Sequence, residues 1–267
     1  LSTQVQGLTA EQIVALSSAQ LAALSTLQIG LLSAEQVAAI ETADLAQLSS
    51  AAIKALSSAH VVALSSDQVA ALSTAQVAAL DTVDVAALSQ EQLLALSSAQ
   101  LRALSTAQVA ALGSDQIAGL GTEQVEALTT AQVRALETID LRALSAEQIQ
   151  VLSTAQIAAL ATHQIAALTS DQVAALEIDD LLVLSTASIK ALGSDQVAAL
   201  TSDQIVAMTS AQIAALTTVP GNQFGGFSTD EIKALTTAQA AALTSAQVKG
   251  FSSDQIAALE TDDLRAI

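Results

Sequence analysis

The sequence lacks cysteine, tryptophan and tyrosine, and among its 267 residues it has only one proline, one methionine and three phenylalanines. Without cysteine there is no disulfide and no thiolate chemistry, so cysteine usage says nothing about the redox compartment. With almost no aromatic side chains, the core has to be built from Ala, Leu, Val and Ile. Hydrophobic residues make up 52% of the chain, which is ample for such a core.

Positive charge is also scarce, because eight Lys and Arg residues stand against 26 Asp and Glu and give a formal net charge of −18. Nucleic acids and anionic membrane surfaces bind clustered basic residues, so this balance argues against both as partners. No apolar run approaches the roughly 20 residues that span a bilayer, because Ser, Thr and Gln interrupt the sequence throughout. No secretion signal is recognisable and the first residue is not Met, so we expect the sequence to be part of a longer or processed protein.

The residue patterns that catalysis requires are missing as well. The two histidines, His60 and His163, have no cysteine or second histidine at ligand spacing, which argues against a metal site. There is no G-x-S-x-G elbow and no glycine-rich phosphate loop. The sequence therefore predicts no enzyme, no cofactor and no metal centre, and it predicts that both histidines are surface substitutions.

What the sequence has in abundance is an eight-residue repeat, which we call an octad. Counted from Leu8 as position 1, the repeat runs to Leu216 without a slip, resumes at Phe227 and continues to the end. Position 1 is nearly always Leu, positions 2 and 3 are mostly Ser or Thr, position 5 is mostly Gln, position 6 is Val, Ile or Leu except at Ala240, and position 8 is mostly Ala. A straight helix or a straight strand does not account for a period of eight, so each octad has to restart the local structure.

The restart signal is a capping box, formed by Ser or Thr at position 2 and Gln at position 5. Apolar residues at positions 1 and 6 supply the hydrophobic staple that accompanies such a box. All eight Lys and Arg residues fall at position 7, near the expected helix end, where the helix dipole favours them. Each octad is therefore predicted to form one short helix of about two turns, with position 7 facing water.

Helices this short are not stable alone, so they have to stack on their neighbours. The predicted fold class is an all-α solenoid whose core consists of positions 1, 6 and 8. A β-solenoid with stacked glutamine ladders is the alternative. The predicted organisation is a repeat solenoid over residues 1–216, a Pro/Gly loop insertion over 217–226, and a continuation of the same solenoid over 227–267.

Five octads replace the hydroxyl at position 2 with an acid and the Gln at position 5 with Asp. One interpretation is a ladder of cation or contact sites, with Ca²⁺ as the candidate ion, and the other is an alternative helix cap, since acids also suit helix N-termini. The pairs are Glu41 and Asp44, Asp81 and Asp84, Glu137 and Asp140, Glu177 and Asp180, and Glu260 and Asp263.

The single break in the repeat contains Pro220 and two of the three phenylalanines, Phe224 and Phe227. The third, Phe251, falls at position 1 of a later octad. The insertion is interpreted either as a tolerated loop whose Phe side chains fill the space it creates, or as a joint or contact point for a partner.

Tracts such as LTTAQVRALETIDLRAL (residues 128–144) and LTSDQIVAMTSAQIAAL (residues 200–216) resemble the long octapeptide tracts of very large bacterial secreted or surface repeat proteins, which are described as adhesin-like or RTX-type. The resemblance implies export, a location outside the cell or on its surface, and an extended structural role. It brings no catalytic residues.

The functional prediction is a structural protein that forms a rod, stalk or filament subunit and associates with itself end to end or laterally. Nucleic acid is not expected as a partner, and no membrane span is expected. The alternative is an adhesion or binding solenoid that recognises a protein, a glycan or Ca²⁺ through its acidic ladder. A spacer that only sets distance is a third hypothesis.

Overall fold

The computed structural model describes residues 2–217 and 223–267, and the chain divides into two compact units, Leu1–Leu136 and Glu137–Ile267. The division lies within the segment 1–216 that the sequence predicts as one continuous solenoid. The insertion after Leu216 lies inside the second unit. Each unit is described by itself below.

The first unit begins with a short 3-10 helix and then has one α-helix in each octad. Its elements are η1 (Ser2–Gly7), α1 (Ala10–Val14), α2 (Ser18–Ala22), α3 (Thr26–Gly30), α4 (Ala34–Ala38), α5 (Thr42–Leu45), α6 (Ser50–Lys54), α7 (Ser58–Ala63), α8 (Ser66–Ala70), α9 (Thr74–Val77), α10 (Thr82–Ala86), α11 (Gln90–Leu94), α12 (Ser98–Ala103), α13 (Thr106–Ala110), α14 (Ser114–Ala118), α15 (Thr122–Ala127) and α16 (Thr130–Ala135).

The second unit continues with one helix in each octad, and a second 3-10 helix lies in the octad that carries the insertion. Its elements are α17 (Thr138–Ala143), α18 (Ala146–Gln150), α19 (Thr154–Ala159), α20 (Thr162–Ala167), α21 (Ser170–Ala174), α22 (Ile178–Val183), α23 (Thr186–Ala191), α24 (Ser194–Ala198), α25 (Ser202–Ala207), α26 (Ser210–Ala215), η2 (Gln223–Gly226), α27 (Thr229–Ala234), α28 (Thr237–Ala241), α29 (Ser245–Lys249), α30 (Ser253–Ala258) and α31 (Thr261–Ala266).

The fold is an all-α solenoid with one short helix per octad, as the sequence predicts. No strand occurs in residues 2–217 or 223–267, so the alternative of a β-solenoid is wrong. The α-helices have four to six residues, which is shorter than the expected two turns of about seven residues.

The helices are short because the backbone leaves the helical conformation at the octad boundary, as the boundary between α12 and α13 shows. Leu104, at position 1, has φ −62° and ψ 137°, and Ser105, at position 2, has φ −68° and ψ 160°. Both conformations are open to any L-residue, so the corner between two helices needs neither glycine nor proline. This explains how a chain with a single proline can change direction at every octad.

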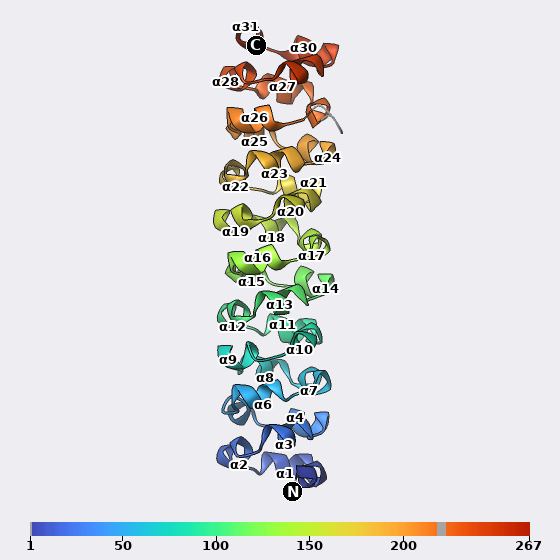
Figure 1. Ribbon diagram of the computed structural model, residues 1–267, viewed down its shortest axis with the longest axis vertical. Coiled ribbons are helices and arrows are strands. Elements are labelled where there is room, and N and C mark those ends of the chain that lie inside the picture. The colour runs from blue at the N-terminus through green and yellow to red at the C-terminus, as the bar shows by residue number, and fades with distance from the viewer. Residues whose placement is uncertain (1, 218–222) are drawn as a thin grey trace. The chain divides into compact units, whose positions relative to one another are not determined.

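Within each unit, helices that pack on one another are three octads apart in the chain. In Figure 1, α4 lies against α7 in the first unit and α20 lies against α23 in the second. The solenoid therefore has about three octads per turn, a number that does not follow from the sequence. We call the preceding turn in chain order within the same unit "the turn beneath".

The core of each unit is formed by positions 1 and 6, as expected, and also by position 5, which the sequence analysis does not place there. Val69 at position 6 and Leu72 at position 1 are both buried. Alanine at position 8 is mostly half-buried, as at Ala71, so it contributes less to the core than predicted. The eight cations at position 7 are all exposed, which confirms the placement of that position.

Candidate functional site

The side chains at position 5 join each turn of the solenoid to the turn beneath. In α12, Oε1 of Gln100 accepts hydrogen bonds from the backbone N–H of Ser97 at 2.7 Å and from its hydroxyl at 2.8 Å. On the other side of the same amide, Nε2 donates to the backbone carbonyls of Val69 at 3.2 Å and Leu72 at 2.7 Å, at the end of α8. One carboxamide therefore caps the start of its own helix and the end of a helix in the turn beneath.

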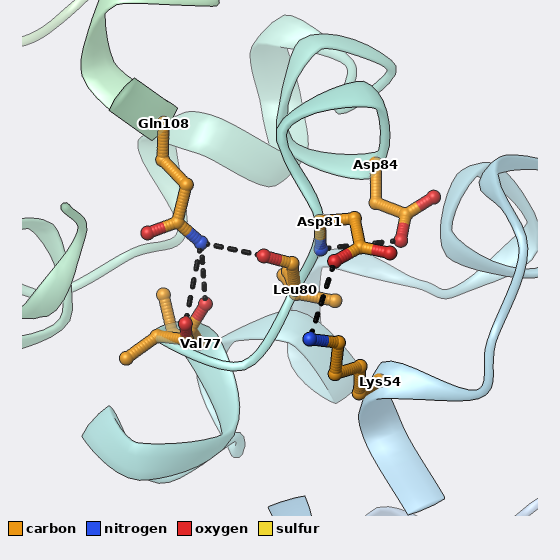
Figure 2. A network of polar contacts seen from close by, with 7 residues as sticks. Lys54, Val77, Leu80, Asp81, Asp84 and Gln108 are labelled. Atoms are coloured by element: carbon orange, nitrogen blue, oxygen red, sulfur yellow. Dashed lines mark hydrogen bonds and ion pairs between the residues drawn. The ribbon is translucent and has the colours of Figure 1, made fainter. Parts of the chain in front are cut away.

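The same arrangement is visible around Gln108 in Figure 2, where Nε2 points to the carbonyl oxygens of Val77 and Leu80. The two N···O distances are 3.3 Å and 2.7 Å. A helix this short has few intrahelical hydrogen bonds, and its last carbonyls need partners from elsewhere. The carboxamide from the next turn supplies them.

This bond to the turn beneath recurs through both units. A carboxamide whose donors and acceptor are all satisfied can lie in the core, and all but one of these glutamines are at most 8% exposed, Gln116 being half-buried. The glutamines that form the bond are Gln36, Gln68, Gln76, Gln92, Gln100, Gln108, Gln116, Gln124 and Gln132 in the first unit, and Gln172, Gln196, Gln204, Gln212, Gln223, Gln239, Gln247 and Gln255 in the second.

His60 takes the place of glutamine in α7 and performs both of its roles. Its Nδ1 accepts from the backbone N–H of Ser57 at 3.1 Å, and its Nε2 lies 2.8 Å from the carbonyl oxygen of Leu32. These two contacts require the neutral ring with its proton on Nε2. The prediction that His60 is a surface substitution is wrong, because the side chain is only 6% exposed, whereas His163 is exposed as expected.

Three other octads have a position-5 residue that cannot make the bond to the turn beneath. Ala52 has no polar side chain, and Ser188 contacts the hydroxyl of Ser185 in its own octad at 3.0 Å. Glu231 accepts from the backbone N–H of Ser228 but, as a carboxylate, has no proton to donate. These sites are natural interruptions in the series of inter-turn bonds.

The aspartates at position 5 of three acidic octads form a different inter-turn bond. Asp84 accepts a hydrogen bond from the hydroxyl of Ser58 at 2.9 Å. Asp44 accepts from Ser18, and Asp180 from Thr154. In each case the donor lies at position 3 of an octad 26 residues earlier. An aspartate thus replaces two donated bonds with one accepted bond between the same two turns.

The acids at position 2 of these octads lie on the surface instead. Glu41, Glu137, Glu177 and Glu260 are exposed and form no side-chain cap hydrogen bond with their own helices. Within an acidic octad the two carboxylates therefore lie in different environments. The acid at position 2 is exposed, whereas at position 5 Asp140 and Asp263, for example, are buried. In the described ranges, no three His, Asp or Glu side chains gather where they could hold a metal ion.

Asp81 is the acid at position 2 that has a cation beside it (Figure 2). Its Oδ1 lies 3.9 Å from Nζ of Lys54, and both side chains are well exposed. An ion pair in water at this distance contributes roughly 0–1 kcal/mol to stability. The backbone N–H of Asp81 also donates to Oδ2 of Asp84 at 3.4 Å, which is a weak form of the capping box.

Asp180 is the acid of this group whose titration is perturbed. Burial raises the pKa of Asp180 above its ordinary value of 3.8, and the neighbouring carboxylates of Glu177 and Asp179 raise it further. Hydrogen bonds from Thr154 and from the backbone of Glu177 act in the opposite direction. Desolvation is the largest of these effects, since it disfavours the charged form of a carboxyl.

Open grooves lie beside three of the acidic octads, where the corner between two helices meets the start of a helix in the next turn. None of the three contains the full set of acids of its octad. The grooves are lined, among other residues, by Glu41 and Asp67, by Lys54 and Asp81, and by Glu177 and Asp203.

The insertion in the second unit preserves the repeat on both sides. Gln223 accepts from Thr217 and donates to the carbonyls of Ile189 and Leu192, so it serves as the position-5 residue of the octad that begins at Leu216. The extra residues therefore lie between positions 2 and 5. Pro220, a predicted contact residue, lies outside the described residues.

The phenylalanines that follow the insertion form a cluster. The rings of Phe224 and Phe227 are 4.8 Å apart in an edge-to-face arrangement, and those of Phe224 and Phe251 are 5.3 Å apart. Phe224 and Phe227 are buried, and Phe251 is half-buried. The first two rings thus occupy core positions of the octad pattern.

Comparison with known protein families gives a match over most of the repeats. A family model described as the ALTTAQ repeat matches more than half of the chain, and its six letters occur in the sequence at residues 127–132 and 234–239. No curated protein matches the chain. Among the described helices, none is both long enough and apolar enough to cross a membrane. The family model matches residues 37–74, 85–122, 116–138, 133–170, 173–210 and 222–253.

Proposed function

The chain belongs to the ALTTAQ repeat family, and from this premise we propose that it is a structural protein, a rod, stalk or filament subunit on the outside of a bacterial cell. Its task is to hold a fixed spacing between what lies at its two ends. It achieves this by repeating one turn of helices, each bonded to the next through buried side chains.

The position-5 carboxamides carry this proposal. The buried polar groups of a binding or catalytic protein converge on a ligand, whereas here they converge on the backbone of the neighbouring turn, as Gln100 does on Val69 and Leu72. A helical repeat fold of this kind is typical of structural proteins. The proposed location outside the cell is supported by the resemblance to bacterial surface repeat proteins.

Length is the property that tests the structural role. We would duplicate residues 88–111, which are three whole octads of the first unit, once and then twice, and measure the maximum dimension by small-angle X-ray scattering. Packed helices are about 8–10 Å apart, so each copy is expected to add about that distance. A maximum dimension that does not grow with the number of octads would contradict the proposal.

Self-association distinguishes a filament subunit from a stalk. Repeat proteins with exposed apolar end turns associate unless capping repeats cover them. We would examine the purified chain by electron microscopy over a range of concentrations. Fibres whose length increases with concentration support a filament subunit. Single particles at every concentration would exclude a filament subunit and favour a stalk.

Antibody labelling tests the proposed location. Intact cells of the bacterium that produces the protein are expected to bind an antibody raised against the second unit without permeabilisation. Labelling that appears only after permeabilisation would contradict a location on the cell exterior.

A further inference from the structure

Helix α22 has an unusual set of exposed apolar side chains. Ile178, Leu182 and Val183 are 42%, 38% and 42% exposed. These residues occupy positions 3, 7 and 8 of their octad, where most octads have Ser or Thr at position 3 and Ala at position 8, and where Ala is the commonest residue at position 7. The apolar substitutions therefore enlarge the water-exposed apolar surface of this helix without adding to the core.

The neighbouring turn extends this surface. Val206 in α25 is 44% exposed and occupies the same octad position as Leu182, and α25 packs on α22. Ile178 and Leu182 are four residues apart, so they lie on one face of α22. We refer to Ile178, Leu182, Val183 and Val206 as the α22 patch.

A groove lined by carboxylates begins at one end of the α22 patch. Ile178 lines this groove together with Glu177, Asp179 and Asp203, all of which are exposed. The groove is open to solvent, and its lining includes the small side chain of Ala174. Apolar and acidic surface therefore adjoin along one helix.

The charge around the groove is negative, and no basic side chain of the helices stacked on α22 neutralises it. The stacked helices α19, α22 and α25 contain no Lys, Arg or His. Glu177, Asp179 and Asp203 thus place three carboxylates around one groove. Carboxylates of like charge this close together favour a bound cation.

We propose that the α22 patch and its groove bind a cationic, amphipathic segment of a partner protein. A Lys or Arg side chain of the partner enters the groove between the carboxylates, and its apolar side chains cover Ile178, Leu182 and Val206. A second copy of this chain is a poor occupant, because its net charge of −18 opposes close approach of an acidic surface. This inference goes beyond the scaffold role and does not depend on it.

The probe is a labelled peptide of three Lys-Leu-Ala-Lys repeats, with binding measured by fluorescence anisotropy on the full chain. A second peptide with Ala in place of Leu keeps the charge and lacks the apolar side chains. The patch variant is Ile178→Thr/Leu182→Ala/Val183→Ala, which places at each position the residue that is commonest there in the other octads. The groove variant is Asp179→Ala/Asp203→Ala, and Val62→Ala, at a 55% exposed apolar residue in the first unit, is the matched control.

The patch and groove variants are each expected to weaken binding of the Leu-containing peptide about tenfold or more, and Val62→Ala less than about twofold. The Ala-containing peptide is expected to bind more weakly than its counterpart. Circular dichroism and melting curves establish that the variants are folded. The proposal is overturned if the chain does not bind the peptide, if both peptides bind equally, or if the patch variant binds as the wild type does. Self-association that disappears in the patch variant would overturn it in favour of a second copy as the occupant.

Discussion

Nε2 of His60 lies 2.8 Å from the carbonyl oxygen of Leu32, in the turn beneath, while Nδ1 accepts from the N–H of Ser57. A histidine and a glutamine have little in common except that each can accept at one atom and donate at another. What the fold requires of the residue at position 5 is therefore this pair of contacts, one accepted and one donated.

His60→Gln is accordingly expected to leave stability unchanged or to raise it slightly, because glutamine makes both contacts in most other octads. His60→Ala leaves a part-buried N–H and a buried carbonyl without partners, which costs about 2 kcal/mol or more. Both are measured as changes in the midpoint of urea unfolding. A loss of stability in His60→Gln as large as that in His60→Ala would show that the contacts are not interchangeable.

Glu231 offers a test in the stabilising direction. It keeps the bond to the N–H of Ser228 but has no donor for the turn beneath. By the spacing seen at Gln239, Glu231→Gln places its amide near the carbonyls of Val197 and Leu200. We expect a gain of about 1–2 kcal/mol in the free energy of unfolding at neutral pH. Asp230→Asn, which removes the charge of the exposed neighbour, serves as the control and should change stability little; an equal gain in both variants would assign the effect to charge alone.

Asp180 makes stability depend on pH in a defined direction. Its folded-state pKa is raised, mainly by burial, so folding favours the protonated carboxyl. The stabilisation from this group is fully present below the ordinary pKa of 3.8 and is lost as the pH rises through the folded-state value. Asp180→Asn should therefore gain stability relative to the wild type as the pH increases across this range.

The measurement for Asp180 is the difference in unfolding midpoint between the wild type and Asp180→Asn, taken from pH 3 to pH 7. Asp203→Asn, at an exposed carboxylate in the next turn, is the control. A difference that is constant over the whole range, or that shrinks as the pH rises, is incompatible with a raised pKa.

Ala161 tests the capping half of the pattern. It is the N-cap of α20 and has no hydroxyl to accept from the helix, although its N–H is bonded to Oε1 of Gln164 at 2.9 Å. Ala161→Ser restores the hydroxyl and is expected to add about 0.5–1 kcal/mol. Ser153→Ala in the preceding octad should lose a similar amount, and thermal unfolding of the two variants measures both. No gain in Ala161→Ser would mean that the hydroxyl half of the box contributes little.

Much of the fold follows from the sequence because its signals are local. The capping box and the staple lie within one octad, so their spacing predicts a helix that restarts at Ser97 or Ser105 without knowledge of its neighbours. The placement of the cations at position 7 follows from the same octad. The number of octads per turn depends on the angle at each corner, which no single octad specifies.

The inter-turn bond of the residue at position 5 is not among the sequence-based predictions, because a capping box within one octad is enough to explain a Gln there. A signal was nevertheless present. A capping box accepts Glu as readily as Gln, and this chain has 26 acids, yet Glu231 is the one Glu at position 5 of a regular octad. The preference for the amide indicates a required donor, and His60 obeys the same requirement.

For the acidic octads the sequence alone does not predict the role of each acid. The sequence groups Glu177 with Asp180 because they are three residues apart, but one is exposed and the other accepts a hydrogen bond from the turn beneath. Whether an acidic octad belongs to the scaffold or to a binding surface depends on which residues the next turn brings beside it. The α22 patch is an example, since Val206 reaches it from an octad 24 residues later.

The central claim is that the position-5 carboxamides hold successive turns together, and Gln100→Met tests it most directly. Methionine keeps the length and volume of the side chain but removes both the acceptor for Ser97 and the donor for Val69 and Leu72. We predict a loss of about 2–4 kcal/mol in the free energy of unfolding by urea, since a part-buried N–H and two buried carbonyls lose their partners. A Gln100→Met protein as stable as the wild type would contradict the account.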